Sequence, residues 1–510
     1  MPMTRILVRI LATLCVSSVL GAAAAVGPSP IRISPEWSHN VGVLKTYTGV
    51  QVCPEPPLRR GNPIHDKLFS ALRDFKGDYD RLQPWLVYPK LAIAELKPPT
   101  GGRTYWDFAL MDQIAADFME ASAGRPVIFN LGAMPFWMLK TSTPSAIPSD
   151  PDAIDWAAYA HGRLRASTIA LFAAYEARLA GWYVNGGFRD EYGSWHPSNH
   201  HYRIAYWEVL NEPDLEESIT PEEYTRLYDA VVDAVRKVAP NMRFAGPAVS
   251  DPTDPAFLAY FLDPKNHRPG IPIDLVSYHF YSQSESDDTS ELADREIFEQ
   301  ADNFITSVRY IDAIRERFSP TTRTAVDELG SMLPGALAPH LIKPIPQEYW
   351  NLSGAMWAYV FGHLAVEGIN VVDAAELIDY PGQVASTTLV KWDTGEPNAR
   401  YWVAKLMRDN FRPGDTVVQP LPPAQELDGP NPGIQVYAQA FITPRGERKL
   451  LLVNKRNWPV DVLVPGASGG RIETASESGP PTKRYVDGET IRLPPLAVAV
   501  LTLNRRKAGA

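Results

Sequence analysis

Two glutamates stand at the ends of apolar, strand-like runs in this chain. Glu212 ends the stretch YWEVLNEP (206–213), in which Pro213 stops the run directly behind the carboxylate. Glu328 holds the same kind of position in RTAVDELG (323–330). Two such carboxylates suit cleavage of a glycosidic bond, because that reaction needs an acid to protonate the leaving oxygen and a carboxylate to act on the anomeric carbon.

The wider pattern predicts how these two residues are positioned. Apolar, β-rich runs alternate with helical periodicity, which predicts an α/β fold of the (β/α)8 TIM barrel type. Strands four and seven of such a barrel place Glu212 and Glu328 across its C-terminal mouth, where a separation of about 5 Å would allow direct attack with net retention of configuration. The eight predicted strands lie in residues 37–44, 79–89, 127–131, 204–210, 243–248, 274–280, 323–327 and 369–373.

A helix is predicted in detail just after the first motif. Thr220 can cap it, Pro221 suits its first position, and Glu223 completes a capping box. Apolar residues four apart then form a stripe that would face the barrel. The stripe consists of Leu227, Val231 and Val235.

The pattern changes after the last predicted helix. A connector rich in Pro and Gly (420–433) leads into short strands without helices, which predicts a C-terminal β-sandwich. We therefore expect a catalytic barrel over 26–412 and a sandwich over 413–510, with residues 31–34 able to pair with the sandwich.

The first 25 residues have the features of a cleaved signal peptide. Arg5 and Arg9 precede a short apolar run that ends in small residues near Ala25, whereas a membrane anchor would need a longer span. The expected location is secreted or periplasmic. Cys15 leaves with this segment, so the mature chain keeps the single thiol of Cys53 and no intrachain disulfide.

Composition bears on the possible partners. The formal net charge is -10 and the chain contains no run of Lys or Arg, so neither nucleic acid nor an anionic membrane is an expected partner. The 45% hydrophobic content is enough to fill a large core. The expected partner is an oligosaccharide or glycoside, and the oligomeric state is left open.

Four motifs in the expected order make the chain similar to a known family. They are Asn211-Glu212-Pro213, Glu328 at the end of strand seven, MPFWM (134–138) and YHFY (278–281). With them the sequence resembles glycoside hydrolase family 39, retaining glycosidases of clan A that include β-xylosidases and α-L-iduronidases. The resemblance implies that Glu212 is the acid/base and Glu328 the nucleophile.

The same resemblance implies further residues around the substrate. Asn211 would bind the sugar's 2-hydroxyl, and His279 and Tyr281 would line the site, one of them holding the nucleophile by a hydrogen bond. Trp137 would lie at the mouth, where an indole can stack on the apolar face of a sugar. Trp85 is a further substrate-binding candidate of this type.

Other polar residues have structural explanations. Asp327 rivals Glu328, but neighbouring strand residues point in opposite directions, so only one should face the substrate and Asp327 is expected to be structural. Glu208 and Asp373 would form hydrogen bonds inside the barrel, and residues 214–217 would be a solvated approach to the helix.

A cluster of histidines lies in the segment 186–203, which is long and could cover the site. His196, His200 and His201 do not have the spacing of a standard zinc site, so no metal is expected there. The two-carboxylate mechanism requires no cofactor.

The expected function is that of a retaining, exo-acting glycoside hydrolase, similar to a β-xylosidase, acting on a plant or microbial oligosaccharide. Alternatives are an endo-acting polysaccharide hydrolase, a non-catalytic carbohydrate-binding relative, and an acidic-sugar hydrolase that would use Lys90 or Arg189 to pair the substrate's carboxylate. The sugar and its linkage are left open, because loop contacts decide them.

Overall fold

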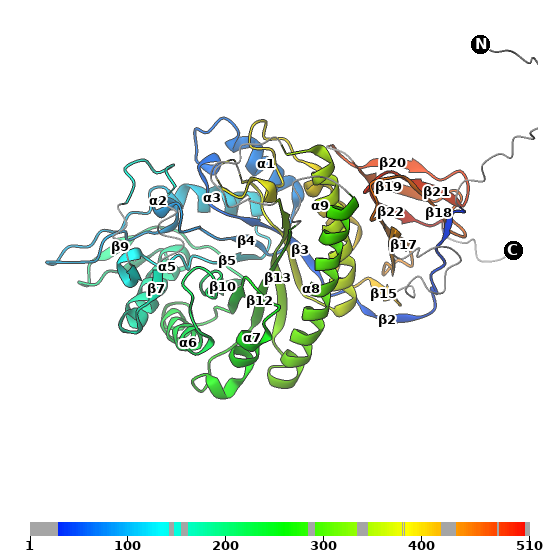
Figure 1. Cartoon of the computed structure of the whole chain (residues 1–510). Helices are drawn as coiled ribbons and strands as arrows, with labels where there is room; N and C mark the ends of the chain where they lie inside the picture. Colours follow the sequence, from blue (N-terminus) through cyan, green and yellow to red (C-terminus); the bar gives the residue numbers. More distant parts are fainter. Residues whose placement is uncertain are drawn as a thin grey trace, which may run out of the picture.

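A computed structural model gives the fold of the chain (Figure 1). It describes residues 29–141, 147–154, 162–283, 291–333, 345–379, 381, 383–419, 435–476 and 479–504. The predicted signal peptide and the connector 420–433 lie outside the described residues. A barrel with its surrounding helices forms one part of the molecule and a β-sandwich the other.

The barrel is closed and its strands pair in parallel, each with the next in the chain and the last with the first. Its strand ends form one mouth, as the sequence predicts. The strands are β3 (Tyr47–Val52), β4 (Asp80–Leu82), β5 (Val127–Phe129), β10 (Tyr206–Glu208), β11 (Phe244–Val249), β12 (Leu275–Gln283), β13 (Arg323–Met332) and β14 (Val371–Ala374).

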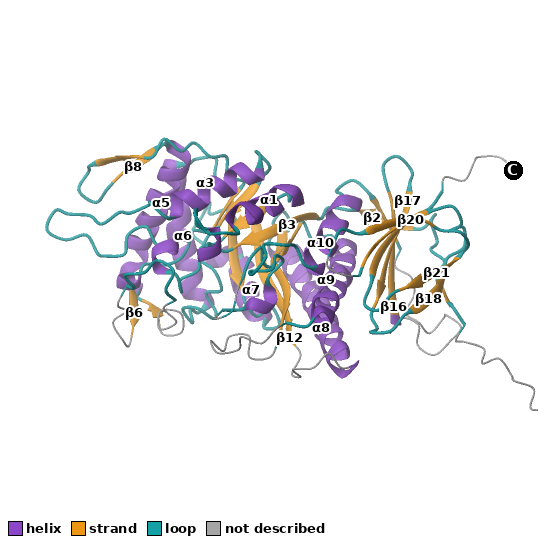
Figure 2. Cartoon of the chain, turned by 90° about the horizontal axis from the view of Figure 1, so that it is seen from above, coloured by secondary structure: helices purple, strands orange, loops and turns teal. Residues whose placement is uncertain are grey.

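A helix follows each of these strands and packs outside the barrel (Figure 2). The capping box at Thr220 and Glu223 is present as predicted. Among the described residues, no helix is long and apolar enough to span a membrane. The helices are α1 (His65–Phe75), α3 (Met111–Ser122), α5 (Ile169–Asn185), α6 (Pro221–Val238), α7 (Pro255–Leu262), α8 (Glu291–Phe318), α9 (Gln347–Glu367) and α10 (Ala399–Asn410).

Shorter elements lie in the loops between these strands and helices. They add two small hairpins and several single turns of helix to the barrel. They are η1 (Pro56–Leu58), α2 (Pro89–Ala92), η2 (Phe136–Met138), β6 (Leu139–Thr141), β7 (Gly162–Leu164), η3 (Ala166–Thr168), β8 (Gly187–Arg189), β9 (Trp195–Pro197), η4 (Pro264–Asn266) and η5 (Ala385–Thr387).

The prediction of the first barrel strand is wrong. The run 37–44 contains β2 (Asn40–Val43), which is exposed and pairs with the sandwich, whereas the barrel begins with β3. Gly49 and Gln51 interrupt the apolar pattern of β3. Each of these residues has a structural explanation. The carboxylate of Asp373 occupies the space beside Gly49, so a side chain would not fit there. The side chain of Gln51 donates to Glu328 at the barrel mouth.

The sandwich consists of two sheets that share one apolar core. The predicted fold of a barrel followed by a β-sandwich is thus confirmed, although N-terminal strands join both sheets. One sheet contains β1 (Ile31–Arg32), β18 (Val460–Leu463) and β21 (Thr490–Leu493). The other contains, in spatial order, β2, β15 (Thr416–Val418), β16 (Val436–Ile442), β17 (Arg448–Asn454), β22 (Val498–Thr502), β19 (Arg471–Ala475) and β20 (Thr482–Tyr485).

The larger sheet packs against helices α9 and α10 of the barrel (Figures 1 and 2). Apolar residues of both parts belong to one continuous core. Gly362 in α9 allows the close approach, because a Cβ there would lie 2.5 Å from the ring of Tyr437. Lys455 lies over the ring of Tyr359, with its Nζ 4.1 Å from the ring centroid.

The packing of β3 generates a test of the barrel's closure. In a Gly49→Ala variant, the new Cβ would lie 2.3 Å from the Oδ1 atom of Asp373, which is fully buried and has little room to move. We expect a loss of about 2 kcal/mol in the free energy of unfolding, as for other overpacked cores. Urea denaturation followed by tryptophan fluorescence measures it.

Gly42→Ala is the matched control, because Gly42 also lies in a strand but has open space around it. This variant should unfold at the wild-type urea concentration or slightly above it. Equal destabilisation by the two substitutions would contradict the packing argument.

Candidate active site

The barrel brings the two predicted carboxylates together at its mouth. Glu212 lies in the turn after β10, and Glu328 lies in β13. One oxygen of each carboxylate and a ring nitrogen of His279 all lie within 4.8 Å of one another. The side chain of Glu212 is 12% exposed and that of Glu328 is 7% exposed, so both carboxylates are largely buried but keep some contact with solvent.

Glu328 accepts hydrogen bonds from three sides. Its Oε1 atom accepts from a guanidinium nitrogen of Arg81 and from Nε2 of Gln51, each at 2.7 Å. Its Oε2 atom accepts from the hydroxyl of Tyr281 at 2.6 Å. This set of donors suits an ionised carboxylate, which can only accept hydrogen bonds.

The surroundings of Glu212 differ from those of Glu328. Its Oε1 atom lies 2.8 Å from Nδ1 of His279. Burial and then the charge of Asp214 raise the pKa of Glu212 to about 8, while Arg81 opposes the rise. Burial also lowers the pKa of His279, so at neutral pH the imidazole is uncharged and Glu212 carries a proton.

His279 and Tyr281 meet the site in different ways. Tyr281 holds Glu328, whereas His279 contacts Glu212 and lies 3.5 Å from Glu328. Burial and the nearby charge of Glu328 raise the pKa of Tyr281 well above its usual value. The phenol therefore stays protonated and remains a donor to Glu328 throughout the neutral range.

The turn that carries Glu212 has an unusual backbone. Leu210 and Glu212 have φ angles of 60° and 41°, in the left-handed region that costs a non-glycine residue about 1–2 kcal/mol. Neighbouring groups hold the turn in place. Asn130 donates to the carbonyl of Leu210, and Gly132 lies so close that a Cβ there would be 2.6 Å from the nitrogen of Leu210.

Arg81, in β4, is the fully buried centre of the site. Its Nε donates to Glu208 at 2.6 Å, and its terminal nitrogens donate to Glu328 and to Oδ1 of Asn211 at 2.7 Å each. Burial alone would raise the pKa of Glu208, but Arg81 and neutral donors outweigh it and lower that pKa to about 2. Sequence reasoning missed Arg81, although a charged residue inside a predicted barrel strand was a usable signal.

The expected opposite orientation of Asp327 and Glu328 is not observed. The pairing of β12 with β13 shifts between Tyr278 and His279, so Asp327 has no partner in the register. As a result both carboxylates reach Arg81, with Oδ2 of Asp327 3.4 Å from its Nε. Burial and the charge of Glu208 raise the pKa of Asp327 well above its ordinary value.

Asn211 uses both ends of its amide. Its Oδ1 accepts from Arg81, and its Nδ2 donates to Glu216 at 2.9 Å, which leaves one N–H for a ligand. The prediction of a solvated segment is wrong for Glu216 and Glu217, which are buried beside the site. Burial, followed by the charges of Glu217 and Glu212, raises the pKa of Glu216 well above its usual range.

The predicted aromatic residues lie in the loops that follow barrel strands. Trp137, in η2, is half-buried, and its Nε1 donates to the carbonyl of Glu95 at 3.0 Å. Trp85 follows β4 and is also half-buried. Their contact with a substrate stays a prediction.

Lys90, the candidate partner for an acidic sugar, donates from its Nζ to the carbonyl of Ser149.

The segment 186–203 forms the hairpin of β8 and β9. Glu191 in this hairpin contacts Trp106 and Arg178, so the hairpin packs along α5. His196 and His200 pair with two different carboxylates, those of Asp190 and Asp112. His201 packs against Gly186 at the end of α5.

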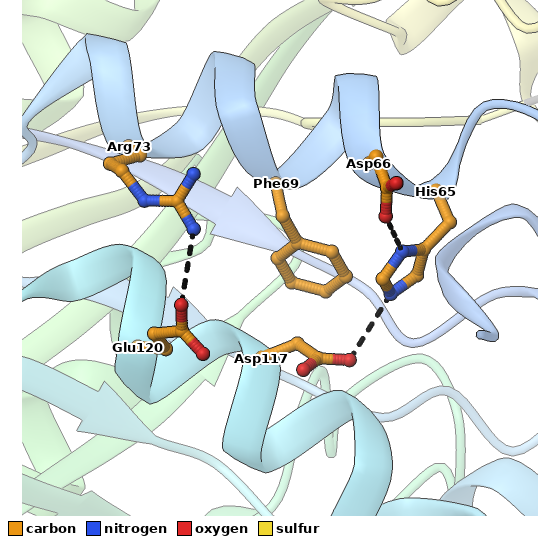
Figure 3. Close-up of a pocket in the computed structure, with 6 residues that line it drawn as sticks. All are labelled: His65, Asp66, Phe69, Arg73, Asp117 and Glu120. Carbon is orange, nitrogen blue, oxygen red and sulfur yellow. Dashed lines mark hydrogen bonds and ion pairs between the residues drawn. The ribbon is translucent and has the colours of Figure 1, made fainter.

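A charged groove lies on helices α1 and α3, apart from the residues of this site (Figure 3). His65 bridges Asp66 and Asp117 there, and Arg73 faces Glu120. Its ionic groups pair with one another across the two helices, which explains the groove as a solvated helix contact.

The site residues after β9 fall within a segment that matches a known family. The sequence model for "Glycosyl hydrolases family 39" matches residues 192–331. This segment includes Glu212, His279, Tyr281 and Glu328. The resemblance predicted from the motifs is therefore confirmed over this part of the chain.

Solved structures share the whole architecture. A GH30 endoxylanase from Clostridium papyrosolvens is 15% identical with a TM-score of 0.54, and the alignment covers 94% of this chain and 100% of that one. A glucosidase from Croceicoccus marinus is 15% identical, with a TM-score of 0.58 and coverage of 93% and 99%. An α-L-arabinofuranosidase from Thermotoga maritima is 12% identical, with a TM-score of 0.59 and coverage of 93% and 99%. At these identities the likeness concerns the fold.

The arrangement around Arg81 generates a prediction about stability. An Arg81→Met variant would leave Glu208 and its neighbours buried without their cation, so we expect the free energy of unfolding at pH 7 to fall by about 3–5 kcal/mol. The lowered pKa of Glu208 contributes stability that is present above its unfolded value near 4.5 and is lost as the pH falls toward 2. The deficit of the variant should therefore shrink below pH 4.5.

Arg60→Met is the control, because Arg60 also holds a carboxylate by two hydrogen bonds, to Asp117, but is exposed. That variant should lose less than about 1 kcal/mol. Urea denaturation of both variants between pH 3 and 7 makes the comparison, and a deficit for Arg81→Met that does not change with pH would count against the proposed charge balance.

Proposed function

We propose that this protein is a retaining glycoside hydrolase that releases a terminal sugar by double displacement, with Glu328 as nucleophile and Glu212 as acid/base. One observation carries the proposal: oxygens of the two carboxylates lie within 4.8 Å of each other. Retaining glycosidases have their carboxyl groups about 5–5.5 Å apart, whereas inverting ones need about 6.5–9.5 Å to admit a water. The family resemblance over residues 192–331 points to the same chemistry.

In the first step, an oxygen of Glu328 attacks the anomeric carbon as the bond to the leaving oxygen breaks. Glu212 donates its proton to that oxygen, so the alcohol leaves neutral and Glu212 becomes a carboxylate. In the tautomer that carries the ring proton on Nδ1, the neutral His279 donates to Oε1 of Glu212 across 2.8 Å and stabilises this new charge. The sugar is now esterified to Glu328.

In the second step, Glu212 removes a proton from water, and the water oxygen attacks the anomeric carbon. The ester bond to Glu328 breaks and both carboxyl groups return to their starting states. Arg81, Gln51 and Tyr281 receive the released carboxylate, which makes Glu328 a good leaving group. The free N–H of Asn211 is the proposed donor to the sugar's 2-hydroxyl.

The near-complete burial of both carboxylates favours exo action. A carboxylate that is only 7% exposed, as Glu328 is, suits a substrate that enters by its chain end, whereas an internal sugar would need an open cleft. We propose a β-xylosidase-like substrate range, with Trp137 and Trp85 as the aromatic surfaces against the sugar.

A neutral sugar is favoured over an acidic one. Each nitrogen of the Arg81 guanidinium already donates to a protein group, so it is not free to pair a substrate carboxylate. Lys90 bonds a backbone carbonyl, and Arg189 donates to Gly193 within the β8–β9 hairpin. These contacts weaken the alternative of an acidic-sugar hydrolase.

We also propose that the chain is exported, with cleavage near Ala25, on the basis of its basic and apolar N-terminal pattern. The proposed units are a barrel over 26–412 and a sandwich over 413–510. Pairing of β1 with β18 and of β2 with β15 ties the start of the first unit to the second.

The assignment of the nucleophile has a direct test. Glu328→Ala should lower kcat/KM on a reactive aryl glycoside by at least about 10⁴-fold, because it removes the group that forms the covalent bond. Azide should restore turnover and give a product of inverted configuration. Turnover is measured on aryl xylosides, arabinosides, galactosides, glucosides, fucosides and glucuronides.

Glu222→Ala is the matched control, since Glu222 is an exposed glutamate in the first turn of α6 and should leave activity unchanged. Near-normal turnover of Glu328→Ala, or a rescued product of retained configuration, would contradict the assignment.

The acid/base assignment predicts a pH profile. Because Glu212 must be protonated in the first step and its pKa is raised to about 8, kcat/KM should fall as the pH rises above about 8. Glu212→Gln should remove this alkaline limb on a dinitrophenyl glycoside, whose leaving group needs no proton. A wild-type profile that is flat from pH 4 to 9, or an unchanged limb in the variant, would disprove the role of Glu212.

A further inference from the structure

A second group of carboxylates lies where the barrel closes. Glu55 follows β3, and Glu376 and Asp379 follow β14, the neighbouring strand in the closed barrel. One carboxylate oxygen from each of the three lies within 4.8 Å of the others. All three side chains are buried.

Glu55 lacks a hydrogen-bond donor among the described residues. It is 0% exposed, and no described residue donates to either of its carboxylate oxygens. A buried carboxyl group without a partner is costly whether it is ionised or protonated, because a protonated one would bury an unused O–H donor. Asp379, in contrast, accepts from the backbone N–H of Val384 and the hydroxyl of Thr387.

No described lysine or arginine forms an ion pair with Glu55 or Glu376. Arg400 is buried nearby, but its terminal nitrogens donate to the backbone carbonyls of Ser386, Thr387 and Ala375. The described residues therefore give Glu55 and Glu376 no ion pair that would compensate their charge.

We propose that Glu55, Glu376 and Asp379 bind a divalent metal ion, Ca²⁺, at the seam where β14 meets β3. Oxygens within 4.8 Å of one another can share one ion at Ca²⁺–oxygen distances of about 2.3–2.6 Å. Carboxylate oxygens favour Ca²⁺ or Mg²⁺ over softer metals. The enclosed site favours Ca²⁺, which accepts bidentate carboxylates, over Mg²⁺, which usually keeps several waters.

The ion would join segments that are far apart in the sequence. Glu55 lies in the loop after β3, the first barrel strand, and Glu376 lies in the loop after β14, the last barrel strand. The ion would therefore link the first and last strands of the closed sheet. The backbone already brings them together, since the N–H of Leu377 donates to the carbonyl of Gln51. Gln51 in turn donates to Glu328, so the bound ion would also help to position the proposed nucleophile.

The test is calcium binding to the full-length protein after dialysis against EDTA. Isothermal titration with CaCl₂ should show one site per chain, and Ca²⁺ at a hundred times its Kd should raise Tm by about 3 °C. MgCl₂ should bind at least tenfold more weakly. Neither readout uses substrate, so failure of the metal site and failure of the proposed hydrolase activity are distinguishable.

Glu55→Gln and Glu376→Gln should each weaken Ca²⁺ binding at least tenfold and abolish the rise in Tm. Glu120→Gln, in the groove on α1 and α3, is the acidic control and should bind as the wild type does. Equal Tm values in EDTA and CaCl₂ without a titration signal would overturn the proposal, and so would binding that survives both substitutions. If a variant fails to fold, the titration of the wild-type protein and its Tm values in EDTA and CaCl₂ still test the proposal.

Discussion

The buried guanidinium of Arg81 is the constraint on which the rest of the barrel mouth depends. An arginine that is fully enclosed is tolerated only if its donors are used and its charge is balanced. Here the three donating nitrogens reach Glu208 in β10, Asn211 in the turn after β10, and Glu328 in β13. Neutralising one charge thus fixes the strand ends that carry the candidate acid/base and nucleophile, and it helps to offset the strain at Leu210 and Glu212.

The same constraint separates the two carboxylates chemically. Glu328 takes a guanidinium, an amide and a phenol, so its charge is solvated by the protein. Glu212 lies in the turn after β10 with the neutral imidazole of His279 as its neighbour. The effect of burial therefore exceeds that of Arg81, and the pKa of Glu212 rises. Two residues of one type therefore suit different roles, because Glu328 accepts a hydrogen bond directly from the guanidinium and Glu212 does not, which is the division of labour that double displacement requires.

The sequence allowed much of the fold to be predicted, and the failures have physical causes. Strands with continuous apolar runs, such as β5 and β11, were found, because burial on both faces removes polar residues. β3 was missed because function places Gln51 in it and packing places Gly49 there. Glu212 and Glu328 could be predicted from their strand ends. The role of Arg81 could not, because its partners come from distant parts of the chain and meet only when the barrel closes.

Acidic residues outnumber basic ones at this mouth, and that excess connects the two clusters. The charge of Glu328 is among the factors that raise the pKa of Glu376, after burial and Asp379. Arg81 compensates the negative charge on the side of the barrel near β10. The terminal nitrogens of Arg400 donate instead to backbone carbonyls. A positive charge between Glu55, Glu376 and Asp379 would compensate the opposite side without touching Glu212. Glu212 would then keep the raised pKa that its role as the acid requires.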